Sequence, residues 1–209
     1  MGVLNKNHVR VTHRNFRSTL GCFLSFFLIA LSVAPASSND ANAAEEPRPT
    51  EYQVKAAYLY NFGRFVRWPT DAAPAQGAAF NICILGRDPF DGALRAVVAG
   101  QTINGHPVTV KEVSDSSGAE GCQIVYVDGT ETKRFRSVLN NVRRMPLVTV
   151  SDSADFLDRG GIIQFTLIND RVRFAVNLEA AREARLQLSA ELLKVAIKVT
   201  GGKVEKEQR

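Results

Sequence analysis

Short apolar runs recur along the middle of the chain and predict buried strands. They lie at residues 80–85, 108–113, 122–127 and 147–150. Apolar runs of this length, bounded by turn residues, are typical of strands that are covered on both faces of a sheet. Two further runs, 162–167 and 171–176, are joined by Asn169-Asp170, and this arrangement predicts an antiparallel hairpin.

Segments with helical periodicity separate these strands. Apolar residues recur every three to four positions over 51–67 and 131–143, which predicts amphipathic helices there. Asp88-Pro89 is a typical helix start, so we expect another helix over 88–99. A last helix is expected from Ala181 to Val199, just before a glycine pair.

Strands that alternate with helices predict an α/β fold. We expect a single layered domain over residues 51–201, with a mixed, mostly parallel sheet of about six strands flanked by helices. The antiparallel hairpin and a helix are expected at its C-terminal end. Residues 44–50 contain two prolines and predict a flexible lead-in, and residues 202–209 predict a polar tail. Sheets of this kind bind ligands beyond the carboxyl ends of their strands.

The N-terminal segment has the pattern of a secretory signal peptide. Basic residues without an acid precede an apolar run at 20–33, and Ala41-Asn42-Ala43 follows. The run is shorter than the roughly 20 residues that a membrane-spanning helix needs. We therefore expect residues 1–43 to be cleaved and the protein to be exported from the cytoplasm. Cleavage after Ala36 is an alternative that Pro35 disfavours.

Most of the excess positive charge of the chain lies in this predicted leader. The whole chain has 26 Lys and Arg against 21 Asp and Glu, a formal net charge of +5. Residues 1–43 hold four of the basic residues and one acid, which leaves a net charge of +2 on the remainder. An excess this small is no argument for nucleic-acid binding, and we expect no nucleic-acid partner.

Residues that commonly carry catalysis are scarce after the leader. His106 is the only histidine left, and it lies in an Asn-Gly-His-Pro turn, so a hydrolase built on it is the weakest alternative. The sequence contains none of the usual phosphate-binding loops or zinc-ligand spacings. We therefore predict that the protein is not an enzyme and has no cofactor or metal.

Three polar residues follow predicted strands, at the edge where α/β folds place functional groups. They are Arg87, Asp128 and Asp152. If the protein were a small-ligand binding module, these residues would be candidates for its pocket. The alternative for the two aspartates is a local role in capping helices and forming turns.

Cys83 and Cys122 are the only cysteines after the leader, and both lie in predicted strands. An even number of cysteines in an exported chain favours a disulfide over two buried thiols, provided that the two strands are neighbours. In the chain-entropy model, a bridge across 39 residues stabilises the fold by roughly 3–4 kcal/mol.

The first predicted helix is apolar around most of its circumference. Its aromatic residues include Tyr58, Phe62 and Phe65, and Trp68 follows shortly after. A helix of this kind is either packed deep in a core or part of an interface. Both interpretations stay open, and these four aromatic residues are the candidates for contact with a partner protein.

The order of several short motifs resembles the YfiR family of periplasmic proteins. The matching stretches include Lys55–Phe62, Trp68-Pro69, Ile82–Gly86, Asp88–Phe90, Leu147–Asp152, Val172–Asn177 and Leu186–Ser189. Arg185 departs from the pattern, because the family often has Gly before the Leu-x-Leu-Ser stretch.

This resemblance implies a non-enzymatic regulator in the periplasm. Its partner would be the periplasmic domain of an inner-membrane diguanylate cyclase, which it would repress and so control cyclic di-GMP and biofilm formation. An outer-membrane lipoprotein is a second implied partner, and a homodimer and a Cys83–Cys122 disulfide are also implied. The alternative is a periplasmic small-ligand or redox-sensing module that serves another membrane sensor.

Overall fold

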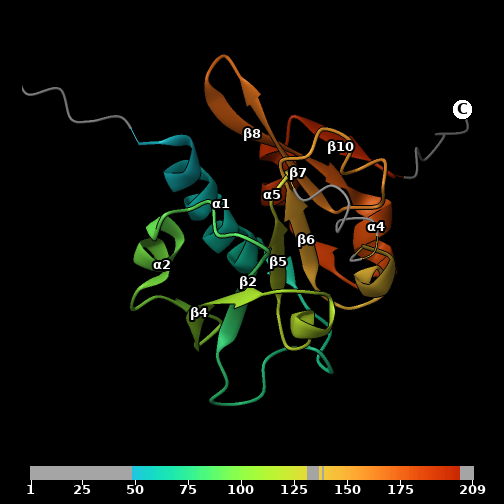
Figure 1. Ribbon diagram of the computed structural model, residues 1–209. Coiled ribbons are helices and arrows are strands. Elements are labelled where there is room, and N and C mark those ends of the chain that lie inside the picture. Colours follow the sequence, from blue (N-terminus) through green and yellow to red (C-terminus); the bar gives the residue numbers. More distant parts are fainter. Residues whose placement is uncertain (1–48, 131–136, 138, 203–209) are drawn as a thin grey trace, which may run out of the picture. The chain divides into compact units, whose positions relative to one another are not determined.

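The computed structural model of the protein describes residues 49–130, 137 and 139–202 (Figure 1). The predicted signal peptide and most of the predicted 131–143 helix lie outside these residues. The domain boundaries proposed from the sequence therefore stay predictions. No helix in the described part of the chain is both long enough and apolar enough to cross a membrane.

An eight-stranded sheet forms the centre of the described fold (Figure 1). Its strands are β2 (Phe80–Leu85), β3 (Thr102–Ile103), β4 (His106–Val113), β5 (Ile124–Val127), β6 (Val148–Ser151), β7 (Ile163–Ile168), β8 (Arg171–Asn177) and β10 (Lys198–Thr200). Their order across the sheet is β10-β8-β7-β6-β5-β2-β4-β3. Strands β4, β2, β5, β6 and β7 run parallel, whereas β8 is antiparallel to β7. The predicted α/β class with a C-terminal hairpin is confirmed, although the sheet has more strands than expected.

Helix α1 (Glu51–Phe65) lies across one face of the sheet and begins at a capping box. Thr50 Oγ1 accepts a hydrogen bond from the Gln53 N–H, and Gln53 Oε1 accepts one from the Thr50 N–H, which satisfies two free donors of the first turn. The helix ends two residues earlier than predicted. Its continuation is a short strand, β1 (Val66–Arg67), which pairs with β9 (Gln187–Leu188) in a separate two-stranded sheet.

Helix α2 (Ala93–Val98) starts later than the sequence predicts. The expected start at Asp88 is wrong, because Asp91 and Gly92 both have positive φ angles, 47° and 78°, and cannot belong to a right-handed helix. Asp88 instead forms a local turn, in which its Oδ1 accepts a hydrogen bond from the Phe90 N–H at 2.8 Å.

The single long helix expected at the C-terminal end is also wrong. Residues 178–200 form α4 (Leu178–Glu183), β9, α5 (Ala190–Val195) and β10. Ser189 interrupts the expected helix because its hydroxyl caps α5, accepting a hydrogen bond from the Leu192 N–H at 3.2 Å. The apolar spacing that suggested one helix is thus divided among four short elements.

Arg185 causes the break after α4. Its φ angle is +58°, in the left-handed region that normally favours glycine. The N–H of Arg185 donates to the Arg182 carbonyl and the N–H of Leu186 donates to the Ala181 carbonyl, each at 2.9 Å. These two bonds form a Schellman motif, the usual helix ending that has glycine at the position of Arg185. The resemblance noted in the sequence implies glycine at this position, and the backbone geometry explains that preference, whereas nothing in the local geometry explains the arginine of this chain.

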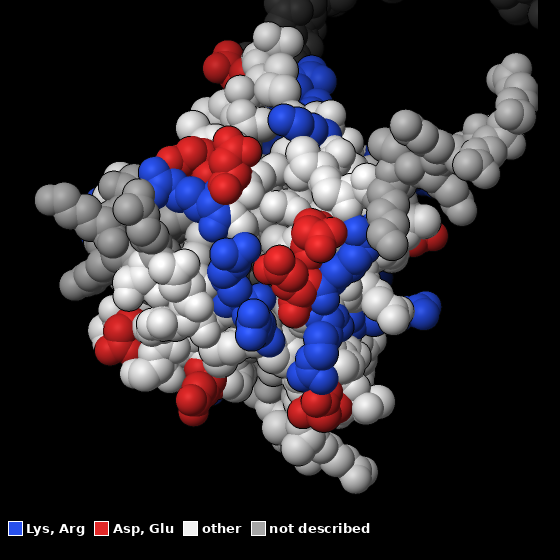
Figure 2. All heavy atoms as spheres, turned by 90° about the vertical axis from the view of Figure 1, so that its right-hand side faces the viewer, with Lys and Arg blue, Asp and Glu red and all other residues white. Residues whose placement is uncertain are grey.

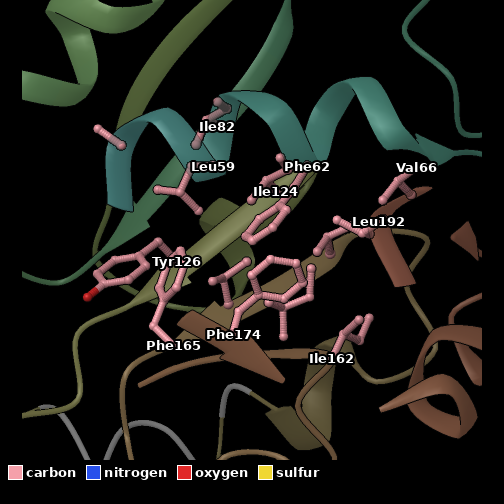
Figure 3. Packing of buried hydrophobic residues seen from close by; sticks show 14 of the residues in the cluster. Leu59, Phe62, Val66, Ile82, Ile124, Tyr126, Ile162, Phe165, Phe174 and Leu192 are labelled. Atoms are coloured by element: carbon pink, nitrogen blue, oxygen red, sulfur yellow. The ribbon is translucent and has the colours of Figure 1, made fainter. Parts of the chain in front are cut away.

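The strands alternate their side chains between two hydrophobic layers. Figure 3 shows Leu59 and Phe62 of α1 packed over one face of the sheet. The sheet contributes to this layer Ile82, Ile124, Tyr126, Phe165 and Phe174. The opposite layer contains Cys83, Leu85, Val125, Val127, Leu139 and Phe156. Because the strands are covered on both faces, they read as continuous apolar runs in the sequence.

A disulfide joins Cys83 to Cys122, with the two Cα atoms 6.0 Å apart. The pairing is possible because β2 lies beside β5, so that Cys122, just before β5, comes next to the strand that carries Cys83. The bridge predicted from the sequence is therefore present in the structure.

Candidate functional site

A groove lies between α1 and the β7–β8 hairpin, and it consists of two adjoining hollows. The first has a volume of about 260 Å³ and is lined by residues that include Glu51, Lys55, Asp152, Gln164, Phe165 and Leu167. The second has a volume of about 460 Å³ and is lined by residues that include Glu51, Val54, Tyr58, Leu167, Arg171 and Arg173. We call the pair the α1–hairpin groove, because Glu51 and Leu167 line both hollows.

Lys55 places a buried positive charge at one end of this groove. The residue is only 2% exposed. Its Nζ donates a hydrogen bond to Asp152 Oδ2 at 2.6 Å and forms an ion pair with Glu51 Oε1 at 2.5 Å. The same Nζ lies 4.5 Å from the centroid of the Tyr52 ring. A buried ammonium group needs such partners, because burial alone would remove its charge.

Asp152, the carboxylate that pairs with Lys55, lies directly after β6. Its Oδ2 also accepts a hydrogen bond from the Tyr126 hydroxyl at 3.0 Å, and its Oδ1 accepts one from the Gly129 N–H at 2.8 Å. A side chain at Gly129 would collide with this carboxylate, since its Cβ would lie 2.6 Å from Oδ1. The carboxyl ends of β5 and β6 thus hold Asp152 in one position under the N-terminal half of α1.

Burial and pairing act in opposite directions on these ionisable groups. Burial of Lys55 lowers its pKa, but the hydrogen bonds to Asp152 and Glu51 outweigh this effect, and the pKa is raised above its ordinary value. Burial of Asp152 raises its pKa, but its hydrogen bond to Lys55 outweighs this, and the pKa is lowered. The pKa of Tyr126 is raised, first by burial and then by the negative charge of Asp152. Lysine and aspartate therefore stay charged and tyrosine stays neutral around neutral pH.

The three polar residues predicted at the strand ends do not form one pocket. Asp152 lines the groove, whereas Asp128 forms a turn in which its Oδ1 accepts hydrogen bonds from the N–H and the hydroxyl of Thr130. Arg87 is exposed and does not line the groove. Sequence reasoning missed Lys55, and the available signal was the Glu51–Lys55 pair, which lies four residues apart on a helix and places opposite charges side by side.

The four aromatic residues predicted for partner contact lie in different surroundings. Tyr58 is partly buried and lines the groove, where its ring lies 5.9 Å from the Phe62 ring. Phe62 is 0% exposed and lies in the core (Figure 3). Phe65 and Trp68 are partly buried near the other end of α1, and the Trp68 ring meets the Phe80 ring edge to face at 5.2 Å. Contact with a partner stays a prediction for this set.

The β7–β8 hairpin contributes exposed apolar side chains in and beside the groove. Leu167 is 52% exposed and Ile168 is 44% exposed at the end of β7. The turn that follows has φ angles of 49° at Asn169 and 56° at Asp170, the left-handed pair that a type I′ hairpin turn requires. The hairpin extends beyond the neighbouring ends of the sheet (Figure 1). Its tip therefore exposes two large apolar side chains to water.

His106 lies away from this groove, at the start of β4. Its Nδ1 is 2.9 Å from the Ala78 carbonyl oxygen, so the ring is held by a backbone contact. The residues that the structure describes contain no group of three or more His, Cys, Asp and Glu side chains that could hold a metal ion.

These features define an α/β protein with an open, partly apolar groove beside the carboxyl ends of its parallel strands. The model of the YfiR/HmsC-like family matches residues 52–197, and the chain belongs to this family. Members of this family are regulatory and not catalytic.

Comparison with solved structures supports the fold. A conserved domain protein from Vibrio cholerae O1 biovar eltor is similar, with a TM-score of 0.50 at 10% sequence identity. The similar region covers 72% of this chain and 60% of that protein, so the chain spans only part of its length. At this sequence identity the likeness concerns the fold alone. A search of the curated proteins finds no match.

Proposed function

We propose that the protein is exported to the periplasm, where it binds the periplasmic domain of an inner-membrane diguanylate cyclase and holds the cyclase inactive. Family membership supports the regulatory class. We place the cyclase-binding surface at the α1–hairpin groove because two large apolar side chains, Leu167 and Ile168, are exposed beside it. By binding one conformation of the cyclase more tightly than the other, the protein would shift the cyclase towards its inactive state.

The groove has the composition of a protein-binding surface. Its apolar side chains are Val54, Tyr58 and Leu167, and charged side chains line it as well, among them Glu51 and Arg171. Interfaces commonly place apolar and aromatic side chains at the centre and polar groups at the rim. Burying exposed Leu or Ile side chains is favourable by about 25 cal/mol per Å² of apolar surface. This arrangement favours a protein partner that inserts an apolar side chain beside Tyr58.

Replacing Leu167 with aspartate is expected to weaken cyclase binding at least tenfold, because a charge at the centre of an apolar contact must be desolvated. In cells, repression should be relieved and cyclic di-GMP should rise. The measurement is co-purification of the protein with the periplasmic domain of an inner-membrane diguanylate cyclase from the same organism, together with cellular cyclic di-GMP. Thermal unfolding should change little, since Leu167 is already exposed.

Val195→Asp is the matched control, because Val195 is 62% exposed on α5, outside the residues that line the groove. This variant should bind the cyclase as the unmodified protein does. If Leu167→Asp binds normally while Val195→Asp fails, the interface lies elsewhere. If neither the unmodified protein nor a deletion strain shows any link to cyclic di-GMP, the proposed function is wrong.

The alternative function is a periplasmic module that senses a small ligand or redox state for another membrane sensor. The volume of the groove is compatible with a small ligand, and the disulfide is a group that could respond to redox state. Thermal-shift measurements with amino acids, nucleotides and vitamins, under oxidising and reducing conditions, would test it. Sequestration by an outer-membrane lipoprotein and formation of a homodimer also belong to the proposal, and size-exclusion chromatography with light scattering tests the latter.

A further inference from the structure

A second, basic hollow lies apart from the α1–hairpin groove. It has a volume of about 900 Å³ and is lined by Asn140, Asn141, Arg143, Arg144, Glu183 and Arg185. Figure 2 views the side on which Figure 1 shows α4, and basic side chains gather there beside acidic ones. Three arginines therefore converge on one concave surface that the regulatory proposal does not use.

Arg143 is held in position from two sides. Its guanidinium forms an ion pair with Glu183 at 3.4 Å. It also lies against the backbone of Gly160, where an added Cβ would come within 3.4 Å of three guanidinium atoms. Because Gly160 has no side chain, the Arg143 guanidinium can lie against its backbone. A guanidinium positioned in this way loses less conformational entropy when it binds a ligand.

Arg144 contributes a charge that is not neutralised within the described part of the chain, where it forms no ion pair. The Asn140 side chain next to it is also exposed. Together they supply a guanidinium and an amide whose N–H groups are available as hydrogen-bond donors.

Arg185 occupies this hollow at a conformational cost. Five residues other than glycine have positive φ angles in the described chain, and the other four are Asp or Asn, which tolerate this conformation well. Arg185 has φ +58° at a helix ending where glycine is normally favoured. Its side chain reaches Asp71 at 2.9 Å across an exposed surface, and such ion pairs stabilise a fold weakly. The strain is better explained by a function for the side chain than by its contribution to folding.

We infer that this hollow binds phosphate-bearing anions. Arg143, Arg144 and Arg185 present planar guanidinium groups, whose N–H pairs match two phosphate oxygens at a time. Glu183 and Asp71 offset two of the three positive charges, which leaves the hollow with a positive balance. Two sources offer the same chemistry, a soluble phosphate compound and the headgroup of an anionic phospholipid.

The test titrates the chain from residue 44 onward with two probes at low ionic strength. Pyrophosphate, followed by calorimetry, represents the soluble source. Vesicles of phosphatidylcholine with about one third phosphatidylglycerol, compared with pure phosphatidylcholine in a sedimentation assay, represent the lipid source. Binding of pyrophosphate alone assigns a soluble ligand, binding of the mixed vesicles alone assigns a lipid surface, and either should weaken steeply with added salt.

Arg185→Gly separates the ligand role from a structural one. This variant should lose at least tenfold in affinity for the probe that binds, while its melting temperature stays the same or rises, because glycine relieves the left-handed backbone. Arg144→Gln should weaken binding to a similar extent. Arg95→Gln is the matched control, since Arg95 is an exposed arginine paired with Glu112 outside this hollow, and it should bind normally. The inference is overturned if the unmodified protein binds neither probe, or if Arg185→Gly and Arg144→Gln bind as tightly as Arg95→Gln.

Discussion

Replacing Lys55 with methionine is expected to lower the free energy of unfolding by about 3 kcal/mol, because removing one member of a buried ion pair leaves the other charge without compensation. Lys55 is 2% exposed and bonds both Asp152 and Glu51. We expect the lower end of the usual range, because the Asp152 side chain keeps 20% exposure and also accepts hydrogen bonds from Tyr126 and Gly129. Urea unfolding followed by circular dichroism measures the loss.

Two further variants show whether the buried pair is the cause. Arg95→Met removes an exposed ion pair with Glu112, whose two side chains are 50% and 54% exposed, and should cost at most about 1 kcal/mol. Adding Asp152→Asn to Lys55→Met should recover part of the loss, because the uncompensated carboxylate is then neutral. Equal losses for Lys55→Met and Arg95→Met would contradict the role given to the buried pair.

The effect of Lys55→Met should depend on pH. The pKa of Asp152 is lowered by folding from an ordinary value of 3.8, so its stabilisation is present above that pH and is lost as the pH falls through the lower folded value. The pKa of Lys55 is raised from 10.5, so its stabilisation is present below that pH and is lost as the pH rises through the higher folded value. The difference between the unmodified protein and Lys55→Met should therefore be largest between about pH 4 and pH 10 and shrink outside this window.

Removing the disulfide is the second change with a large expected effect. With Cys83 and Cys122 both replaced by alanine, the free energy of unfolding should fall by about 3–4 kcal/mol, because the unfolded chain is freed from a loop closed across 39 residues. Cys83 is also 0% exposed within the second hydrophobic layer, and the shorter alanine side chain leaves some of that space empty.

Reduction provides the control for the disulfide prediction. Dithiothreitol should destabilise the chain from residue 44 onward, which has only these two cysteines, and should leave the double alanine variant unchanged. Urea unfolding with and without the reductant makes the comparison, and an unchanged m-value would show that the unfolded ensembles remain comparable. A stability that does not respond to dithiothreitol would contradict the predicted contribution of the bridge.

The sequence was most informative where burial dictates residue type. Strand β2 is predicted with its observed bounds because both of its faces are covered and five of its six buried positions are apolar. The β7–β8 hairpin was predicted within one residue at each end, since Asn169-Asp170 is a turn signal that depends on local backbone preference. Local preference and burial are properties that a short stretch of sequence carries by itself.

Predictions from the sequence were wrong where the structure of one segment depends on pairing with another segment distant in the chain. The short strands β1 and β9 pair residues such as Val66 and Leu188, and this pairing ends α1 early and divides the expected C-terminal helix. The helix periodicity over residues 181–199 was genuine as a pattern of apolar positions. It was misleading because Arg185 adopts a left-handed backbone conformation, which is uncommon for arginine and could not be predicted from its residue type.

By itself the sequence determined the α/β class, the family resemblance, the two cysteines available for a bridge and the aromatic residues of α1. Only the tertiary structure decided that Asp152 meets Lys55 across 97 residues, that Phe62 lies in the core while Tyr58 lines a groove, and that Arg185 faces the same hollow as Arg143. The physical reason is the range of the interactions. Hydrophobic periodicity and turn preference act between near neighbours in the chain, whereas ion pairs, grooves and exposed patches form between segments that only folding brings together.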